Sequence, residues 1–501
     1  MALTKVSRSL ISGGVVSVLD YGALDNNSSG SASANTTAIK AACAAVQSAG
    51  GGVLLFPYSD AGIYQIDVTV GDTIGSFVDL PGVEIRFEGT TLKDIQTYPG
   101  STDTSTLFSF TRCKNIEVNA NIESALIVTG ASPTARGLIA TKLVDTCTNF
   151  DIKLTMNGGR NGVWITRDPL TENKSRQGRI DVDCTSVLYP YAATWSGDDV
   201  IANINATLCG RNFFIYGVSN NTIRVNSKNQ QITSLIDGNG GSAVYTEGCS
   251  NIDVDFYDRN TDNGSGAPLI ELVFRVAATA YKNIKVDLDV SCPASNGFGD
   301  SFRFVNTDAT TGHSVNGLTI SGVSEKAAGV AHGHVDTNFA FASGDSISNV
   351  LIENLKCTGA AANFNLPLEQ LAGPTATFNN VLSDDCALIA TNGGNGIVNY
   401  IGCRTTYTST GTDAHAFLNC VLTDSGTQND SGKRYINTVL GAAYTTLLNN
   451  QYVLTNGIGI IDGVTAPSTD ASFAQIYVDT ADGDLKIKFS DGTVKTIVTD
   501  T

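Results

Sequence analysis

Apolar and polar residues alternate along most of the chain with a period of two residues. Five stretches share one phrase, in which an Asn is followed by an apolar residue, any residue and a second apolar residue. They are RCKNIEV from Arg112, TCTNFDI from Thr146, GCSNIDV from Gly248, AYKNIKV from Ala280 and SISNVLI from Ser346. A period of two is the pattern of a β-strand with one buried face, so each phrase predicts a strand.

The phrase recurs at intervals of roughly twenty to thirty-five residues, as internal repeats of a solenoid do. Its anchors are Asn115, Asn149, Asn251, Asn283 and Asn349, and looser copies lie at Arg179, Asn203, near Asn221, Asn316 and Asn380. A single repeat cannot bury its apolar face alone, so the repeats must stack. The pattern therefore predicts an all-β fold, a right-handed parallel β-helix, with the anchor Asn at a corner where stacked amides bond from coil to coil.

One stretch has helical periodicity instead. In NTTAIKAACAAVQSAGGGVLLFP, which starts at Asn35, Ile39, Ala42, Cys43 and Val46 share one helical face. Asn35 or Thr36 is a candidate N-cap, and the three glycines end the helix before a strand. We predict a helix over about residues 36–49 that caps the open end of the solenoid.

The C-terminal stretch has three alternating segments, near 474–479, 484–489 and 493–498, separated by the Asp-Gly turns of ADGD and SDGT. A three-stranded sheet of this size is marginal as a monomer, so we expect it to pack against copies of itself in a homotrimer. The polar stretch from Thr423 to Arg434 is the expected border. The predicted division is a leader over 1–20, a β-helix body over 21–430 and a β-rich trimerisation or capping module over 431–501.

Composition excludes several classes of protein. The net charge of −17 opposes binding to nucleic acid or to anionic membrane surfaces. No apolar run reaches membrane-spanning length, and the N-terminal residues do not form a signal peptide, so we expect synthesis in a reducing cytoplasm. The cysteines are scattered without a CxxC pair, which favours buried thiols over zinc ligands; Cys113, Cys147 and Cys249 share one place in the phrase. We expect neither a cofactor nor a metal site, and His332 and His334 are expected in a solvated turn.

The N-terminal region resembles a known family. VSVLDYGALDNN, followed by the TTAIKAA helix, the GGG strand start and Tyr64-Gln65-Ile66, is similar to the start of the pectate-lyase-like β-helix of bacteriophage tailspikes. The leader LTKVSRSLISGG is also similar to leaders of phage tail proteins. The resemblance implies a homotrimer on the virion, attached by its N-terminus to another tail protein, that binds and often cleaves a bacterial surface polysaccharide at the host cell surface.

Glycoside hydrolysis needs two carboxylates, and acidic residues precede several anchors by four positions: Asp145, Asp199, Glu247 and Asp345. Equivalent positions two coils apart are separated by about 9.6 Å. Asp199 and Glu247 are such a pair if Asn221 marks the coil between them, and side chains could bring them to inverting distance. Asp198 and Asp237 could replace either one. Solvated turn residues are the alternative for each acid.

Aromatic residues near these acids could stack on sugar rings. The predicted binding residues are Trp195, Tyr189, Tyr191, Tyr245, Tyr257, Arg259 and Arg275. Core packing and structural ion pairs are the alternatives. The GDDV stretch with Asp198 and Asp199 also resembles one element of polygalacturonases, but the other elements of that pattern are out of order or missing, so its mechanism is not transferred.

The expected function is hydrolysis of a bacterial surface polysaccharide, with one carboxylate as general acid and one activating water. Two alternatives stay open. A pure adhesin would bind the polysaccharide without cutting it. A lyase would leave a new double bond in the product, and Arg, Lys or Tyr would matter more than paired carboxylates.

Overall fold

The structure is a computed structural model. It describes residues 14–58, 60–100, 103–127, 136–167, 173–237, 247–259, 268–274, 279–292, 299–306, 312–330, 334–337, 346–360, 364–365, 375–379, 382–390, 397–409, 415–423, 434–436, 438–440, 454–455, 457–458 and 475–499. In these ranges α1 (Ala32–Ser48) is the one α-helix, and no helix there has the length and apolar character needed to cross a membrane.

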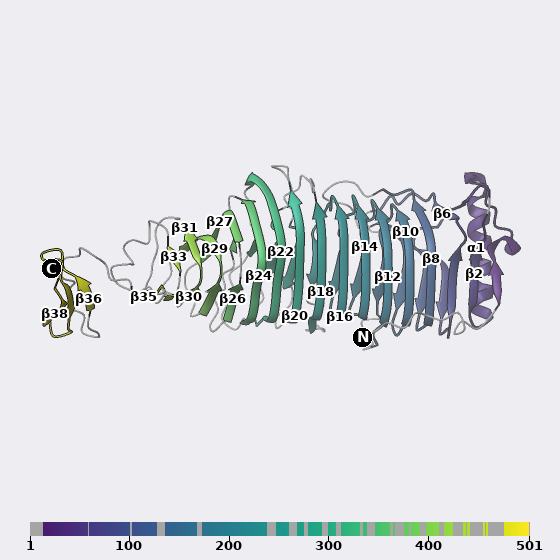
Figure 1. Cartoon of the computed structure of the whole chain (residues 1–501). Coiled ribbons are helices and arrows are strands. Elements are labelled where there is room, and N and C mark those ends of the chain that lie inside the picture. Colours follow the sequence, from purple (N-terminus) through teal and green to yellow (C-terminus); the bar gives the residue numbers. More distant parts are fainter. Residues whose placement is uncertain are drawn as a thin grey trace.

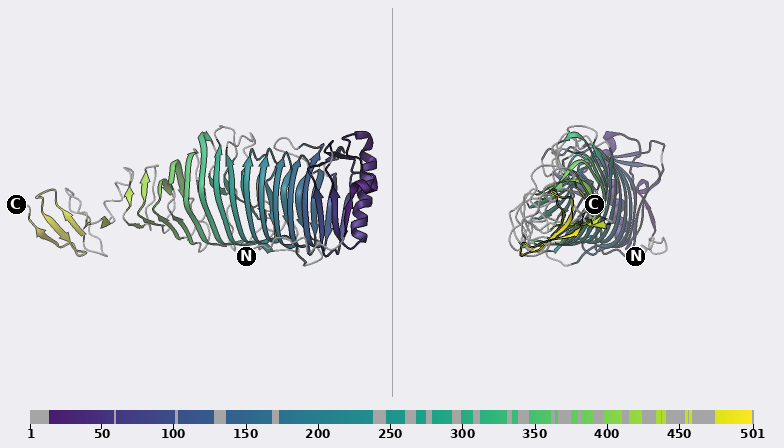
Figure 2. Two further views of the ribbon diagram at one scale, coloured as in Figure 1. Left: turned by 45° about the vertical axis from the view of Figure 1, so that its right-hand side comes forward. Right: turned by 60° about the vertical axis from the view of Figure 1, so that its left-hand side comes forward.

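Strands of the repeats stack into parallel ladders that wind along one axis (Figures 1 and 2). After β1 (Val15–Ser17), the first two coils have three strands each: β2 (Gly52–Phe56), β3 (Ile63–Ile66) and β4 (Thr73–Val78), then β5 (Val83–Phe87), β6 (Thr91–Asp94) and β7 (Thr104–Thr111). β8 (Lys114–Ser124) pairs with both β5 and β6, so from this coil onward one long strand covers two sides.

Long and short strands then alternate along the chain. The long ones are β8, β10 (Thr148–Asn157), β12 (Arg176–Thr185), β14 (Asp198–Thr207), β16 (Ser219–Lys228), β18 (Glu247–Arg259), β20 (Ala280–Cys292), β22 (Ser314–Val330) and β24 (Ser346–Ala360). The short ones are β9 (Gly137–Val144), β11 (Asn161–Thr166), β13 (Tyr189–Thr194), β15 (Phe213–Tyr216), β17 (Ser234–Asp237), β19 (Ile270–Phe274), β21 (Phe302–Asn306) and β23 (Val335–Thr337). The predicted parallel β-helix is confirmed.

The stack continues through shorter strands. They are β25 (Phe364–Asn365), β26 (Thr375–Asn379), β27 (Leu382–Ala390), β28 (Ile397–Ile401), β29 (Arg404–Ser409), β30 (His415–Leu418), β31 (Val421–Thr423), β32 (Arg434–Ile436) and β33 (Val439–Leu440). The next pair, β34 (Leu454–Thr455) and β35 (Gly457–Ile458), is antiparallel. The proposed boundary near residue 430 stays a prediction.

The anchor Asn residues form a ladder at the corner where each long strand begins. Asn115, Asn149, Asn251, Asn283 and Asn349 all have left-handed backbone, with φ between 49° and 62°. Their amides bond from coil to coil, as in Asn149 to Asn115 (2.7 Å) and Asn283 to Asn251 (2.8 Å). Asn tolerates this backbone better than most residues because its short polar side chain bonds locally. The corner predicted from the repeated phrase is therefore observed.

The looser copies are registered differently from the sequence-based expectation. The strand pairing puts Gln177, Asp199, Asn220 and Gly317 at the corner, all with positive φ, and not Arg179, Asn203, Asn221 or Asn316. Arg179 and Asn203 lie two and four residues past the corner, where the apolar alternation is the same, while Asn221 and Asn316 lie one residue from it. Backbone conformation, which that alternation does not encode, decides the true register.

Inward side chains of successive strands form continuous apolar rows. Ile152, Ile180, Ala202 and Ile223 are neighbours in register and fully buried. Cys113, Cys147 and Cys249 are also fully buried, as predicted, and burial raises the pKa of the Cys147 thiol to about 12. These thiols are therefore packing groups and not reactive ones.

The predicted capping helix is present and covers one end of the stack (Figure 1). Ile39, Ala42, Cys43 and Val46 are buried, as the helical pattern indicates. The predicted N-cap is wrong, because α1 begins at Ala32 and Ser31 precedes it. Asn35 lies inside the helix and is buried, with its amide bonded to the backbone of Leu24 and Gln65, so it joins the cap to the first coil.

The three predicted C-terminal strands are confirmed as an antiparallel sheet of β36 (Gln475–Val478), β37 (Leu485–Lys488) and β38 (Val494–Val498). Apolar side chains on β38 are open to solvent in the single chain: Val494, Ile497 and Val498 are 42%, 48% and 58% exposed. Such a sheet would gain stability from a partner, and the homotrimer stays a prediction.

The Asn ladder predicts that replacing Asn251 destabilises the protein, and that alanine does so more than glycine. Asn251 donates to Asn220 and accepts from Asn283 with left-handed backbone, so Asn251→Ala removes two bonds and strains the corner. We expect a loss of about 2–4 kcal/mol in the free energy of unfolding. Asn251→Gly should cost less, because glycine takes positive φ without strain. Urea unfolding of both variants checks this; equal losses would contradict the backbone part of the argument.

Candidate functional site

Asp198 and Asp199 lie at the corner where β14 begins. Asp199 occupies the ladder position, with φ of 58°, and accepts a hydrogen bond from Asn220 Nδ2 at 3.0 Å. Asp198 accepts one from the backbone N–H of Ser219 at 2.9 Å and lies 3.5 Å from the Lys174 ammonium. Both carboxylates therefore hold the turn in place.

The register on which the Asp199–Glu247 pair was based is wrong. Asp199 is in register with Asn220 and Asn251, so Glu247 precedes its equivalent by four residues. The backbone of Glu247 starts β18, but its side chain lies outside the described part of the molecule, as do Tyr245 and Arg275. Asp237, at the end of β17, is fully buried. Catalysis by Asp199, Asp198, Glu247 or Asp237 stays a prediction.

The predicted binding residues are divided between different parts of the molecule. Tyr191 lies in the core, where burial raises the pKa of its hydroxyl, so it presents no surface to a sugar. Tyr189 and Trp195 are half-buried and belong to the side formed by the short strands. Tyr257 and Arg259 lie on the side formed by the long strands. The sequence-based set is therefore not one site.

The two sides covered by the long strands are the better candidate for chemistry, and we call the outward side chains of β8 to β22 the long-strand face. In β18, Ile252, Val254 and Phe256 point into the core, at most 1% exposed, so Asp255 and Tyr257 point outward. Strand pairing aligns each outward position with the same position in the next coil. Its outward side chains are mostly Asp, Asn, Lys and Arg, held on a rigid backbone about 4.8 Å apart from coil to coil.

Two acidic residues occupy the same outward position in adjacent coils of this face. Asp255 of β18 and Asp287 of β20 are partners in the parallel register. The Arg224 guanidinium lies 3.5 Å from Asp255, and the Ser321 hydroxyl donates to Asp287 at 3.2 Å. Their backbones are about 4.8 Å apart, so side-chain rotation would be enough to bring the two carboxyl groups to the 5–5.5 Å of retaining glycosidases.

An exposed aromatic ring lies beside the acid pair. Tyr257 is 43% exposed and is the register partner of Asp289. The Arg259 guanidinium lies 6.0 Å from the Tyr257 ring and forms ion pairs with Asp289 and with Glu325. Those contacts fix the ring's surroundings, and an open tyrosine face can stack on the C–H face of a sugar.

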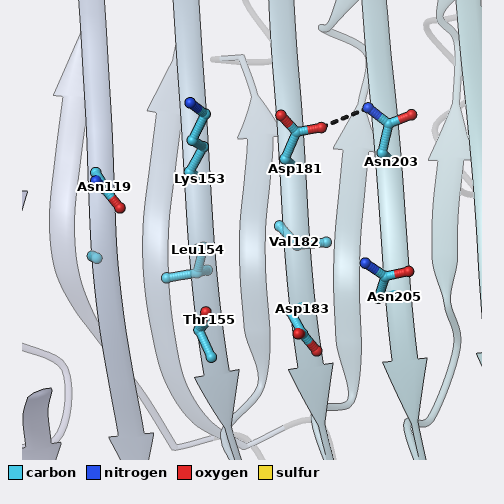
Figure 3. A pocket seen from close by; sticks show the side chains of 10 residues that line it. Asn119, Lys153, Leu154, Thr155, Asp181, Val182, Asp183, Asn203 and Asn205 are labelled. Carbon is cyan, nitrogen blue, oxygen red and sulfur yellow. Dashed lines mark hydrogen bonds between the residues drawn. The ribbon is translucent and has the colours of Figure 1, made fainter. Parts of the chain in front are cut away.

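A groove of about 240 Å³ lies on the same face and begins two coils from β18 toward the N-terminus. Figure 3 shows its polar lining: Asn119, Lys153, Thr155, Asp181, Asp183, Asn203 and Asn205. Arg179 donates to Asp181 at 2.8 Å and Asn203 donates to it at 2.5 Å. Amides, an ammonium and carboxylates on one surface can bond the hydroxyls of a carbohydrate.

Sequence reasoning missed the acid pair, although the signal is present. Both acids follow a ladder Asn by four residues, in NIDVD and NIKVD. The prediction used acids four residues before the anchor, in the turns, where Asp is common for conformational reasons.

The expectation of a solvated turn is wrong for His334. It is fully buried and hydrogen-bonded to Ser324, and burial lowers its pKa to about 3. His332 lies outside the described residues.

Comparison with known proteins gives likenesses of fold. No family model and no curated protein sequence matches the chain. Among solved structures, the catalytic unit of the GH87 α-1,3-glucanase from Streptomyces thermodiastaticus is 15% identical, with a TM-score of 0.39, covering 75% of this chain and 69% of that one. Tailspike protein 3 of bacteriophage CBA120 is 12% identical, with a TM-score of 0.30, covering 97% and 70%. The tailspike of E. coli bacteriophage HK620, a double mutant, is 10% identical, with a TM-score of 0.34, covering 87% and 80%.

Asp199→Asn separates a ladder role from a catalytic one. An Asn at this corner can both accept from Asn220 and take positive φ, as the other ladder residues do. If Asp199 acts only as a ladder residue, the variant should keep the wild-type thermal midpoint and the wild-type rate of polysaccharide cleavage. A stable variant whose cleavage rate falls 100-fold or more would restore Asp199 as a catalytic acid.

Proposed function

We propose that this protein is a bacteriophage tailspike that binds a bacterial surface polysaccharide and cleaves it by glycoside hydrolysis on the long-strand face. The observation that carries the proposal is the acid pair, Asp255 and Asp287, on adjacent coils with the exposed Tyr257 beside it. The pectate-lyase-like N-terminal signature in the sequence and the exposed apolar residues of β38 support a trimeric virion protein, attached through its N-terminus to other tail proteins.

The mechanism follows from the spacing of the two acids. At retaining distance, one carboxylate attacks the anomeric carbon while the other protonates the leaving oxygen and later removes a proton from water. We assign the attack to Asp255, which the Arg224 guanidinium orients. We assign proton transfer to Asp287, which accepts a hydrogen bond from the Ser321 hydroxyl. Tyr257 would position the sugar by stacking. This proposed pair differs from the inverting pair expected from the sequence, Asp199 and Glu247, whose role in catalysis stays a prediction.

The groove extends the same surface toward the N-terminus. Asp183 and Tyr257 occupy the same outward position, with Asn205 and Asn226 in the coils between them. Three coil steps span about 14 Å, so a polymer lying along the helix axis could contact both the groove and the acid pair. Side chains of this row that bond hydroxyls would bind the polymer on either side of the cleaved bond.

Removing either acid should abolish cleavage. We expect Asp255→Asn and Asp287→Asn each to lower the rate of release of reducing ends from host polysaccharide by about 100-fold or more, with binding retained. Asp79→Asn is the matched control, because Asp79 forms an exposed ion pair with Arg112 at a distant turn. Full activity of both site variants would contradict the proposed pair.

Incubation of the wild-type protein with host polysaccharide, followed by chain length and ultraviolet absorbance, distinguishes hydrolase, lyase and adhesin. Shortening of the polysaccharide without new ultraviolet absorbance supports hydrolysis. Shortening with a new absorbance would identify a lyase and rule out the acid-pair mechanism. Retention of an intact polysaccharide on the protein would identify an adhesin. Failure to bind at all would overturn the proposed function.

A further inference from the structure

The outward side of the short strands carries a second surface of different composition. Trp164 of β11 lies between fully buried Val163 and Ile165, and Phe214 of β15 lies between fully buried Phe213 and Ile215, so both rings face outward. Strand pairing puts Lys142, Trp164, Ala192 and Phe214 in one row across four coils. This row defines the centre of what we call the aromatic–basic patch.

Beyond Ala192, which is buried, aromatic rings extend the patch from Phe214 toward the corner. Tyr189 stacks on Phe214 with ring centroids 6.0 Å apart, and Phe214 contacts Tyr216 at 5.1 Å. Tyr216 in turn contacts Trp195 at 4.9 Å. All four rings are half-buried, so each offers part of its surface. A row of partly open rings on rigid strands is suited to the C–H faces of successive sugars.

Two cations converge on one ring of the patch. Lys142 Nζ lies 4.7 Å from the Trp164 ring centroid, and the Arg160 guanidinium lies 5.3 Å from it. Neither cation has an ion pair with a carboxylate among the residues that the structure describes. Arg211 adds a third cation, 5.8 Å from the Phe214 ring. The patch is thus locally basic in a chain whose net charge is −17.

The arrangement is costly without a ligand. Burial lowers the pKa of both Lys142 and Arg160, and the neighbouring guanidinium lowers that of Lys142 further. Two partly desolvated charges of the same sign repel each other. An anion bound between them would relieve that repulsion, and contact with the Trp164 ring already offsets part of the desolvation cost. The ring itself is fixed, because Trp164 Nε1 donates to Thr194 Oγ1 at 3.1 Å.

We infer that the aromatic–basic patch is a binding site for an anionic sugar, with its carboxylate or phosphate between Lys142 and Arg160 and neighbouring sugars along Tyr189, Phe214 and Trp195. This inference rests on the proposed function and specifies it: the polysaccharide is acidic, and it is held on a face separate from the acid pair. A planar guanidinium beside an ammonium suits either anion.

The test measures binding of the full-length protein to polygalacturonate and to the same polymer with its carboxylates methyl-esterified. We expect binding to the charged polymer only, weakening steeply as salt is raised. The double variant Lys142→Gln with Arg160→Gln should weaken binding at least tenfold. Lys282→Gln, which removes an exposed charge from β20, is the matched control and should bind as the wild type does.

Competition distinguishes the two anions. Galacturonate or galactose 6-phosphate at equal ionic strength should displace the polymer, and neutral galactose should not. Displacement by only one of them identifies carboxylate or phosphate as the group that is bound. Equal binding of charged and esterified polymer, no binding of the charged polymer at low salt, or no effect of the double variant would each overturn the inference.

Failure of this inference can be told apart from failure of the proposed function. If host polysaccharide is shortened by the wild type and by the Lys142/Arg160 double variant with equal KM, the function stands and the anionic site is wrong. If the charged polymer binds through the patch but Asp255→Asn and Asp287→Asn leave cleavage unchanged, the site stands and the acid-pair mechanism is wrong.

Discussion

The left-handed corner at the start of each long strand is the constraint on which the rest of the structure depends. A residue there must accept positive φ, and an Asn can do so while its amide bonds to the coils on either side. Because side chains alternate with a period of two, this fixed corner decides which residues of the following strand point inward. A shift of one residue at the corner would exchange the apolar row for the polar one.

The same constraint determines which residues are neighbours on the surface. Once corners are stacked, outward residues at equal distances from the corner are neighbours about 4.8 Å apart, whatever the lengths of the loops between them. Asp255 and Asp287 are 32 residues apart along the chain but are neighbours in adjacent coils for this reason alone. Lys142, Trp164 and Phe214 are brought together on the other face in the same way. Both candidate sites are thus products of register.

This dependence explains what the sequence could and could not predict. The Asn phrase predicted the strands, the stacking and the corner, because an apolar alternation and a residue that favours positive φ are both visible in the letters. It failed where another residue takes the corner: Gln177, Asp199 and Gly317 carry no phrase, so the register slipped and Asp199 was paired with Glu247. Asn35 was misassigned as a cap because its partners, Leu24 and Gln65, are distant in sequence. The acid pair was missed for a different reason: its anchors, Asn251 and Asn283, were predicted correctly, but the candidate pair was sought among acids before the anchors and not after them.

Coil length gives a reason for the position of part of both surfaces. Only 22 residues separate Gln177 from Asp199, and 21 separate Asp199 from Asn220, whereas 34 separate Asn115 from Asn149 and 32 separate Asn251 from Asn283. In a short coil nearly all residues are in strands and tight turns, so few loop residues remain that could cover the outward side chains of its strands. Asp181, Asp183, Asn203 and Asn205 of the groove, and Tyr189, Trp195 and Phe214 of the aromatic row, all belong to these coils. Between β8 and β24 these two repeats are the shortest, and a long polymer can reach their strands from both sides.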